Sequence, residues 1–539
     1  MDTAIREAAP QDKISACLSK KRNFLLSGGA GSGKTHTLVE TLGQIFNENM
    51  DTSVACVTYT NVAANEIKER APYTNLWVST IHEFLWREIK IFQKNLICVF
   101  DEEFGAEESV DMTKVTKISY QNYRNLPEGI ISHNDLIKIA ERMFAKYPKL
   151  AKIFCDKYDY ILIDEYQDTD ANVIKIFLSH IKPFAIQKLC VGMFGDKMQS
   201  IYNGVEAQDG LGQYVDDFEY IEKSDNYRCS QEVIKLLNEV RDDIKQIPSN
   251  KDSDGNITNL HGSAVFVYSH QPFNYDELCK SHLVNGWDFD DPKKTKVLML
   301  THNLIARHNN FGRIVECYKN CEKTKEYASE RLLGGNPDEL AKLILRACDL
   351  IHMFKIKDYK SLLSEMDLEI KNNGDKGTVS NIFKGIIADT NSTIGAVLEK
   401  LNNARIVVSE STIAKYYETD EYGSFFNEIS GISLQEAENY YEYYNGLLPF
   451  STQHGVKGAE YDNVLIVLDN GRWNKYNFGY LFEETPNRAS VIEATKKIFY
   501  VCCSRSKDNL IVFMQSPSRQ AILKATAWFG AENCINLDN

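Results

Sequence analysis

A glycine-rich turn between two apolar segments constrains the fold of this chain more than any other feature. Residues 24–46 read FLLSGGAGSGKTHTLVETLGQIF, and Gly28, Gly33, Lys34 and Thr35 complete the pattern GxxxxGK[ST]. The apolar run before the turn predicts a strand, and apolar residues at helical spacing after it predict a helix. Such a turn curls its backbone N–H groups around phosphate oxygens at the positive end of a helix dipole. The segment therefore predicts an α/β fold that binds a nucleotide.

The pattern gives each residue of the turn a role. Lys34 is expected to reach the β- and γ-phosphates of ATP, and Thr35 to help hold Mg²⁺. A glycine-rich turn without a ligand is the alternative, and the Lys-Thr pair between strand and helix argues against it. The complete phosphate-binding set is Gly28, Gly29, Ala30, Gly31, Ser32, Gly33, Lys34 and Thr35.

An acidic pair farther along the chain indicates hydrolysis. Residues 158–170 read YDYILIDEYQDTD, in which an apolar run ends at Asp164 and Glu165. Asp164 is expected to hold Mg²⁺, and Glu165 to orient and deprotonate the attacking water. An ordinary acidic loop is the other interpretation of these letters. Together with the phosphate loop, the pair indicates a nucleotide hydrolase.

The order of the motifs resembles that of the UvrD/Rep/PcrA helicases of superfamily 1A, from about residue 11 to residue 513. The segments that follow the family order are VTYTNVAANEIKERA (57–71), STIHEFLWRE (79–88), GDKMQSIYNG (195–204), SDNYRCSQEV (224–233), FSTQHGVKGAEYDNVLIV (450–467) and YVCCSRSKDNLIVF (500–513). This resemblance implies an ATP-dependent helicase or translocase. It would move 3′ to 5′ along single-stranded DNA and hydrolyse ATP with Mg²⁺ in a cleft between two domains.

The same resemblance implies roles at the nucleotide. Gln199 would sense the γ-phosphate, and Arg228 and Arg505 would act as arginine fingers from the second RecA-like half. Such fingers change phosphoryl-transfer rates by about 10³–10⁵. The residues implied to lie around the base or near the nucleotide are Gln11, Tyr227, Gly458 and Glu460.

The DNA contacts implied by the family are distributed over four segments. Taken alone, Asn61 could be a plain helix cap, and His82 is as well explained as a core or surface histidine. Tyr202 is followed by Asn-Gly-Val-Glu, where the family usually continues Gly-Trp-Arg-Gly. A lost stacking contact, worth about 1–3 kcal/mol per base, predicts weak unwinding with ATP hydrolysis retained. The DNA set is Thr58, Tyr59, Thr60, Asn61, Thr80, His82, Tyr202, Thr452 and His454.

The motif order predicts an α/β fold with two RecA-like P-loop NTPase domains. Each would be a parallel sheet flanked by helices and interrupted by a mainly helical insertion. The expected ranges are 1–85 and 150–228 for domain 1A, 86–149 for insertion 1B, 229–305 and 446–539 for domain 2A, and 306–445 for insertion 2B.

Helical patterns support the helical character of the insertions. Residues 134–154 and 338–354 carry apolar residues at helical spacing. The tyrosine-dense segment 435–446 has two interpretations, a stacking surface for nucleic acid or a packed helix face, and base rates favour the packed face.

Composition limits the cellular setting and the class of cofactor. The 13 cysteines form no CxxC pair, so buried reduced thiols are expected rather than a metal cluster. No apolar run is long enough for a membrane span and no secretory leader is evident, which predicts a cytoplasmic protein. A net charge of −14 argues only weakly against DNA, because a motor can hold its track in a narrow local groove.

Three functions remain open. The first is an autonomous helicase acting on single-stranded or tailed DNA. The second is a DNA-sensing ATPase subunit that regulates a separate nuclease of the OLD/TOPRIM type and unwinds little by itself. The compact build, with short insertions and no expected fused nuclease, resembles the helicase-like subunits of the Gabija anti-phage system. The third is a nucleotide switch without nucleic acid, against which the threonine-rich DNA segments argue.

Overall fold

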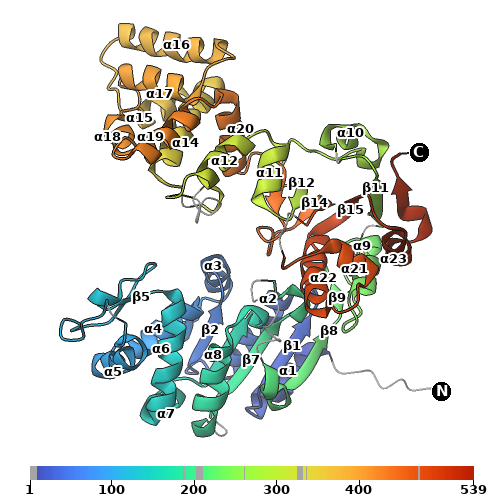
Figure 1. Ribbon diagram of the computed structural model, residues 1–539. Coiled ribbons are helices and arrows are strands. Elements are labelled where there is room, and N and C mark those ends of the chain that lie inside the picture. The colour runs from blue at the N-terminus through green and yellow to red at the C-terminus, as the bar shows by residue number, and fades with distance from the viewer. Residues whose placement is uncertain are drawn as a thin grey trace. The chain divides into compact units, whose positions relative to one another are not determined.

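The computed structural model describes residues 9–107, 109–185, 188–201, 211–259, 261–272, 274–324, 332–335, 337–470 and 474–538. These residues form two compact units, in both of which helices surround a sheet (Figure 1). The first unit comprises Met1–Ala264, Asn474–Asn509 and Ser518–Cys534, and the second comprises Val265–Trp473, Leu510–Pro517 and Ile535–Asn539.

The first unit is organised around a six-stranded sheet of order β3-β2-β6-β7-β1-β8. All neighbouring strands in this sheet are parallel. Strands covered on both faces are expected to read as continuous apolar runs, and β1 and β6 are buried at every position. The strands are β1 (Phe24–Gly28), β2 (Val54–Thr58), β3 (Leu76–Thr80), β6 (Tyr160–Asp164), β7 (Cys190–Gly195) and β8 (Glu219–Lys223).

Helices cover both faces of this sheet with separate apolar layers. Leu26 packs in the layer that contains Leu38 of α2, whereas its neighbour Leu25 packs in the layer that contains Phe84 of α4. This alternation is the two-residue period of a strand. The first layer includes α1 (Pro10–Ser19), α2 (Lys34–Glu48) and α3 (Asn61–Arg70), and the second includes α4 (Ile81–Ile89), α5 (Gln93–Phe104), α6 (His133–Lys146), α7 (Pro148–Lys157) and α8 (Ala171–Lys175).

Segments from the middle and the end of the chain complete the first unit. Helix α22 contacts α9 and α21, and α23 contacts α9 and α21. The helices are α9 (Gln231–Val240), α21 (Phe478–Glu483), α22 (Ala489–Cys503) and α23 (Arg519–Phe529). Two small parallel pairs are β4 (Ser119–Tyr120) with β5 (Ile130–Ile131), and β9 (Asp225–Asn226) with β10 (Ile247–Pro248).

The second unit is organised around another six-stranded sheet, of order β13-β12-β14-β15-β11-β16. Strand β12 is parallel to both of its neighbours. The strands are β11 (Ser263–Ser269), β12 (Thr295–Met299), β13 (Phe450–Thr452), β14 (Tyr461–Leu468), β15 (Ser506–Gln515) and β16 (Cys534–Asn536). Two sheets of this kind, each flanked by helices, confirm the predicted pair of RecA-like domains.

A helical array is inserted in the second unit between β12 and β13. Its helices are α11 (His302–His308), α12 (Gly312–Asn320), α14 (Glu339–Lys355), α15 (Tyr359–Glu365), α16 (Asn373–Ala388), α17 (Ile394–Asn403), α18 (Glu410–Lys415), α19 (Asp420–Ser430) and α20 (Leu434–Tyr444), while α10 (Tyr275–Lys280) precedes β12. The helix predicted over 338–354 is confirmed as α14. In α20, Tyr440 and Tyr441 are buried in the core, so the tyrosine-dense segment is a packed helix face.

The single helix predicted over 134–154 is wrong in one respect, because the segment forms two helices. Helix α6 ends at Lys146 and α7 begins at Pro148. Proline lacks an N–H donor and disfavours helical backbone in the residue before it. Tyr147 accordingly has φ −118° and ψ 83°.

Two expectations from composition concern the cysteines and the membrane. None of the 13 cysteines, all of which lie in the described ranges, forms a disulfide, and most of them are buried. Within the described residues, no helix combines the length and the apolar character needed to cross a bilayer.

Candidate nucleotide and DNA sites

The phosphate loop follows β1 and leads directly into α2. Gly31 and Gly33 have φ of +73° and +75°, in the left-handed region that favours glycine. A Cβ atom at Gly31 would lie 2.7 Å from the Cβ of Arg228. Glycine is therefore required at this position both by the backbone and by the side chain next to it.

Lys34 is buried at the start of α2. Its ammonium donates hydrogen bonds to the carbonyls of Gly28 at 3.0 Å and Gly29 at 3.2 Å. Burial lowers the pKa of Lys34, although the carboxylates of Asp196 and Glu165 raise it. The ammonium thus lies over the loop with acidic groups nearby, where an ATP phosphate would meet it.

Two polar atoms near the expected nucleotide are buried without a hydrogen bond in the described part of the chain. They are the hydroxyl of Ser32 in the phosphate loop and Oε1 of Gln11 on α1. A buried polar atom without a partner costs about 1–3 kcal/mol. A phosphate oxygen at Ser32 and an adenine amino group at Gln11 would satisfy these atoms, so the residues fit ATP.

The acidic pair lies at the end of β6. Asp164 is buried, and its Oδ1 accepts a hydrogen bond of 3.0 Å from the backbone N–H of Glu165. Burial, followed by the charge of Glu165, raises the pKa of Asp164 to about 7. Glu165 has φ +54°, an unusual conformation for a residue with a side chain. Together with Thr35, Asp164 offers hard oxygen ligands that fit Mg²⁺.

The proposed γ-phosphate sensor follows β7, the strand between β1 and β6. Gln199 is buried, and its side-chain amide donates a hydrogen bond of 3.0 Å to Oδ2 of Asp196. Asp196 receives a further hydrogen bond of 3.1 Å from the N–H of Met198. The carboxyl ends of β1, β6 and β7 therefore bring the phosphate loop, the acidic pair and Gln199 to one edge of the sheet.

Both expected arginine fingers belong to the same compact unit as the phosphate loop. The guanidinium of Arg228 donates a hydrogen bond of 3.4 Å to the carbonyl of Ser504. Arg505 is buried, and its guanidinium donates to the carbonyl of Val501 at 3.0 Å. Burial, and then the charge of Arg228, lowers the pKa of Arg505 to about 10. The two cations are thus neighbours in an arrangement suited to an anionic ligand.

Tyr227 connects the arginine segment to the loop. Its backbone N–H donates a hydrogen bond of 2.8 Å to the carbonyl of Gly31. A Cβ atom at Gly33 would lie 3.7 Å from its ring. The ring is partly exposed, as a platform for a nucleobase must be.

The DNA residues of the first unit lie at the ends of two paired strands. Thr58 at the end of β2 is opposite Thr80 at the end of β3. The hydroxyl of Thr58 is buried without a hydrogen-bond partner among the described residues, and Tyr59 is exposed. The expected cap at Asn61 is wrong: Thr60 caps α3 by accepting from Ala63 N–H at 3.2 Å. Thr60 has the β-region backbone of an N-cap, whereas Asn61 is already helical and exposed.

His82 is half-buried in the first turn of α4. Its ring stacks on that of His133 with a centroid distance of 4.7 Å. Burial, and then the charge of His133, lowers the pKa of His82 to about 4. His82 is therefore a neutral aromatic ring at physiological pH.

The remaining predicted site residues fall outside the first unit or outside the described chain. Thr452 ends β13 and its hydroxyl accepts a hydrogen bond of 3.1 Å from Gly455 N–H. His454 is half-buried, Gly458 has φ +88° and Glu460 is exposed, all in the second unit. Tyr202 lies outside the described residues.

Sequence reasoning did not single out several buried polar residues around the phosphate loop. They are Gln167, Asp196, Asn226, Arg241, Gln246 and Tyr500. Asp196 and Asn226 stand inside recognised motifs. By contrast, Arg241 follows an amphipathic helix in a run of charged residues, a pattern that normally indicates solvent.

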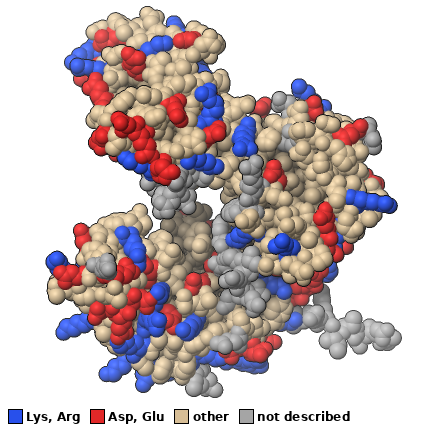
Figure 2. Space-filling model, viewed as in Figure 1, with Lys and Arg blue, Asp and Glu red and all other residues tan. Residues whose placement is uncertain are grey.

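Charge is mixed over the surface. On the face drawn in Figure 2, Lys and Arg side chains are interspersed with Asp and Glu side chains over both units. A DNA track on such a protein would be defined by local groups such as the strand-end threonines. The net charge of −14 is spread over the whole chain and does not describe that edge.

Comparison with known proteins agrees with this geometry. Residues 11–205 match the AAA domain family, and residues 154–516 match the UvrD-like helicase C-terminal domain family. Gabija protein GajB of Bacillus cereus (strain HuB5-5) is 26% identical, with 92% of this chain and 93% of the relative covered. DNA helicase II of Rickettsia typhi (strain ATCC VR-144 / Wilmington) is 22% identical, with coverages of 92% and 90%. The ATP-dependent DNA helicase PcrA of Staphylococcus aureus (strain Mu50 / ATCC 700699) is 24% identical, with coverages of 82% and 75%.

Proposed function

Because this chain belongs to the UvrD-like helicase family and is thus an ATP-dependent DNA helicase, we propose that it is a single-stranded DNA translocase that moves 3′ to 5′. One observation supports translocation, and the polarity rests on the resemblance to the UvrD/Rep/PcrA helicases. The phosphate loop, the acidic pair and two of the threonines proposed to contact DNA, Thr58 and Thr80, lie at the carboxyl edge of one parallel sheet. Ligands of such sheets bind at this edge. A change of shape at the nucleotide can therefore reach the DNA segments through short, rigid strands.

The residues of the nucleotide site have separate roles in ATP hydrolysis. Lys34 neutralises the phosphates, and Glu165 orients a water and accepts its proton. Thr35 and Asp164 would hold Mg²⁺, which neutralises charge on the triphosphate when bound. Arg228 and Arg505 stabilise the negative charge that develops on the transferred phosphoryl group.

Tyr227 and Gln11 would hold the adenine of the same nucleotide. The ring of Tyr227 offers a stacking face, and Oε1 of Gln11 offers an acceptor for the amino group. Purine nucleotides are then expected to bind more tightly than pyrimidine nucleotides.

A second function deserves the same test, because Gabija protein GajB matches this chain over nearly the full length of both. In this alternative the ATPase senses single-stranded or tailed DNA and regulates a separate nuclease of the OLD/TOPRIM type. The Asn-Gly-Val-Glu sequence after Tyr202 favours it, because a usual stacking platform is replaced. If the protein binds the DNA strand weakly, ATP turnover can continue without efficient strand displacement.

The experiment compares ATP turnover with strand displacement in the purified chain. Single-stranded DNA should stimulate ATP turnover several-fold, while a 3′-tailed duplex of about two helical turns should be unwound poorly. A 5′-tailed duplex is the control for polarity. ATP turnover unaffected by DNA would contradict the translocase, and unwinding at a rate comparable to ATP turnover would contradict the nuclease-regulating alternative. Addition of a co-expressed nuclease should then change DNA cleavage in an ATP-dependent way.

A further inference from the structure

Arg241 is a fully buried arginine that the hydrolysis chemistry above does not use. It follows α9, and its exposed fraction is 0%, as is that of its partner Asp196. The guanidinium donates to Oδ1 of Asp196 at 3.2 Å and to Oδ2 at 3.4 Å, which makes the contact bidentate. A third hydrogen bond, of 2.8 Å, reaches Oδ1 of Asp243.

Arg241 also reaches the phosphate loop through one hydroxyl group. Its Nη1 donates a hydrogen bond of 2.6 Å to the hydroxyl of Tyr500, which accepts another of 3.0 Å from the N–H of Ala30. The same hydroxyl donates to Oε1 of Gln246 at 3.3 Å. The Tyr500 hydroxyl thus joins Arg241 to the backbone of the loop.

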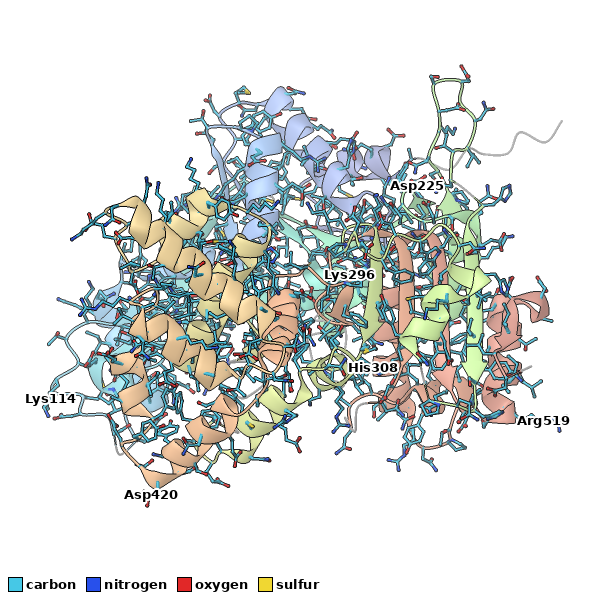
Figure 3. All side chains as sticks on the ribbon, turned by 90° about the horizontal axis from the view of Figure 1, so that it is seen from above. Lys114, Asp225, Lys296, His308, Asp420 and Arg519 are labelled. Carbon is cyan, nitrogen blue, oxygen red and sulfur yellow. The ribbon has the colours of Figure 1, made fainter. Side chains whose placement is uncertain are left out.

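The carbonyl of Ala30 is held from the same side. It accepts hydrogen bonds of 2.8 Å from the Gln246 amide and 3.1 Å from the Asn226 amide. Asp225, labelled in Figure 3, immediately precedes Asn226 in the chain. The backbone N–H and the carbonyl of Ala30 are therefore both held by side chains, from Asn226 and Gln246 and from Tyr500 of α22.

At its other end, the network reaches Gln199, the proposed γ-phosphate sensor, and Glu165, the proposed base. Asp196, the partner of Arg241, accepts from Gln199 at 3.0 Å, and its own N–H donates to Oε1 of Gln167 at 3.0 Å. The amide of Gln167 in turn donates to Glu165. A continuous hydrogen-bonded path thus connects the proposed base, the proposed sensor and the phosphate loop through the guanidinium of Arg241.

Stability alone does not account for this pair. Desolvating two charges costs as much as their attraction returns, so replacing a buried pair by apolar residues is often neutral or stabilising. Loss of one partner, by contrast, leaves an uncompensated charge. A bidentate guanidinium fixes the positions and orientations of the groups to which it is hydrogen-bonded.

We propose that Arg241 is a positioning residue that fixes the phosphate loop and the Gln199 sensor in one geometry through Tyr500 and Asp196. The proposal rests on the proposed ATP hydrolysis. The hydrogen bonds of Arg241 go to Asp196, Asp243 and Tyr500, so in this proposal it acts through groups that hold the loop and the sensor. Its loss should therefore lower kcat for ATP more than it changes KM.

The test compares Arg241→Met, Arg241→Lys and Tyr500→Phe with the full-length wild-type chain. Arg346→Met is the matched control, since Arg346 forms a bidentate pair with Asp367 on the surface of the second unit. Each protein is assayed for kcat and KM with saturating single-stranded DNA, and for its midpoint of urea unfolding. Hydrogen exchange is followed in the peptide that contains Ala30.

The expected results separate positioning from folding. Arg241→Met should lower kcat by about 10- to 100-fold, in line with the loss of hydrogen bonds to a charged group, and Arg241→Lys should recover only part of it. Tyr500→Phe keeps the ring and the charged pair. It should still lower kcat by about three- to tenfold and speed exchange of the Ala30 amide, with a smaller fall in the unfolding midpoint than in Arg241→Met, because no charge is left unpaired. Arg346→Met should match the wild type.

The double variant Arg241→Met with Asp196→Leu tests whether misfolding explains a loss of activity in Arg241→Met. Removal of both charges should recover part of the unfolding midpoint without restoring kcat, because Asp196 also accepts hydrogen bonds from Met198 and Gln199. Recovery of kcat together with stability, or unchanged kcat and unchanged Ala30 exchange in Tyr500→Phe, would overturn the positioning role. Failure of the proposed function is distinguishable, because the wild-type chain itself would then lack DNA-stimulated ATP turnover.

Discussion

At the scale of single residues, Lys34 is the group whose removal should have the simplest effect. Its ammonium is held over the phosphate loop by the carbonyls of Gly28 and Gly29. Lys34→Ala should abolish ATP turnover, because the phosphates lose their fixed cation. The measurement is phosphate release with single-stranded DNA present. Lys400→Ala, which breaks an exposed ion pair with Asp389, should leave turnover unchanged.

Glu165 should separate binding from hydrolysis. In Glu165→Gln the side chain can still accept a hydrogen bond from water but no longer takes its proton, while Asp164 remains to hold the metal. We expect ATP binding within about threefold of the wild type and turnover reduced by about 10²-fold or more. Binding is measured with a fluorescent ATP analogue. Wild-type turnover in this variant would remove Glu165 from the mechanism; the exposed Glu239→Gln on α9 is the control.

The arginines Arg228 and Arg505 should matter chiefly in the transition state. Arg228→Ala and Arg505→Ala are each expected to lower kcat by about 10³–10⁵ with a modest change in nucleotide affinity. Since Arg505 is buried, the unfolding midpoint of the Arg505→Ala protein is measured together with its turnover. Both residues belong to the unit that contains the phosphate loop, so specific activity should not depend on protein concentration. A steep dependence would indicate fingers supplied by a second molecule.

At the scale of an element, the junction of β3 and α4 carries a pH-sensitive group. The pKa of His82 is lowered from 6.5 to about 4, so the unfolded chain binds more protons between these pH values. The His82 contribution to stability is complete above about pH 6.5 and is lost as the pH falls toward 4. For a half-buried ring, screening reduces this contribution to about 1–2 kcal/mol.

The corresponding prediction is a difference between two pH profiles. His82→Gln should show a smaller fall in the free energy of unfolding between pH 7 and pH 4 than the wild type. Urea titrations at a series of pH values provide the measurement. His261→Gln, at an exposed position, should follow the wild-type profile. Parallel profiles for His82→Gln and the wild type would contradict the lowered pKa.

At the scale of the whole molecule, an acidic chain is expected to bind an acidic polymer through local contacts. For roughly three to five phosphate contacts, affinity for single-stranded DNA should fall by about 20- to 100-fold when salt rises from about 50 to about 200 mM. Fluorescence anisotropy of a labelled oligonucleotide measures this slope. Affinity independent of salt would contradict a track built on phosphate contacts.

Much of the fold and part of the site were predictable because the relevant signals are local. The phosphate loop is one continuous segment between a strand and a helix, and the acidic pair ends one apolar strand. Their glycine and carboxylate chemistry is visible in adjacent letters. The apolar runs that begin β1 and β6 likewise indicate strands buried on both faces, as in a parallel sheet. The break between α6 and α7 also has a local cause, because Pro148 directly follows Tyr147 in the sequence.

Only the tertiary structure decided which distant polar groups meet. Arg241 lies 45 residues from Asp196 and 259 residues from Tyr500, yet the three form one buried network. In the sequence, Arg241 stands among charged neighbours like any solvated arginine. Whether such a charge is buried depends on the packing of α9 against α22, helices that are far apart in the sequence. The sequence by itself therefore determined the nucleotide chemistry, which short motifs encode. Packing determined which groups hold that chemistry in place, because burial and pairing are properties of contacts between remote segments.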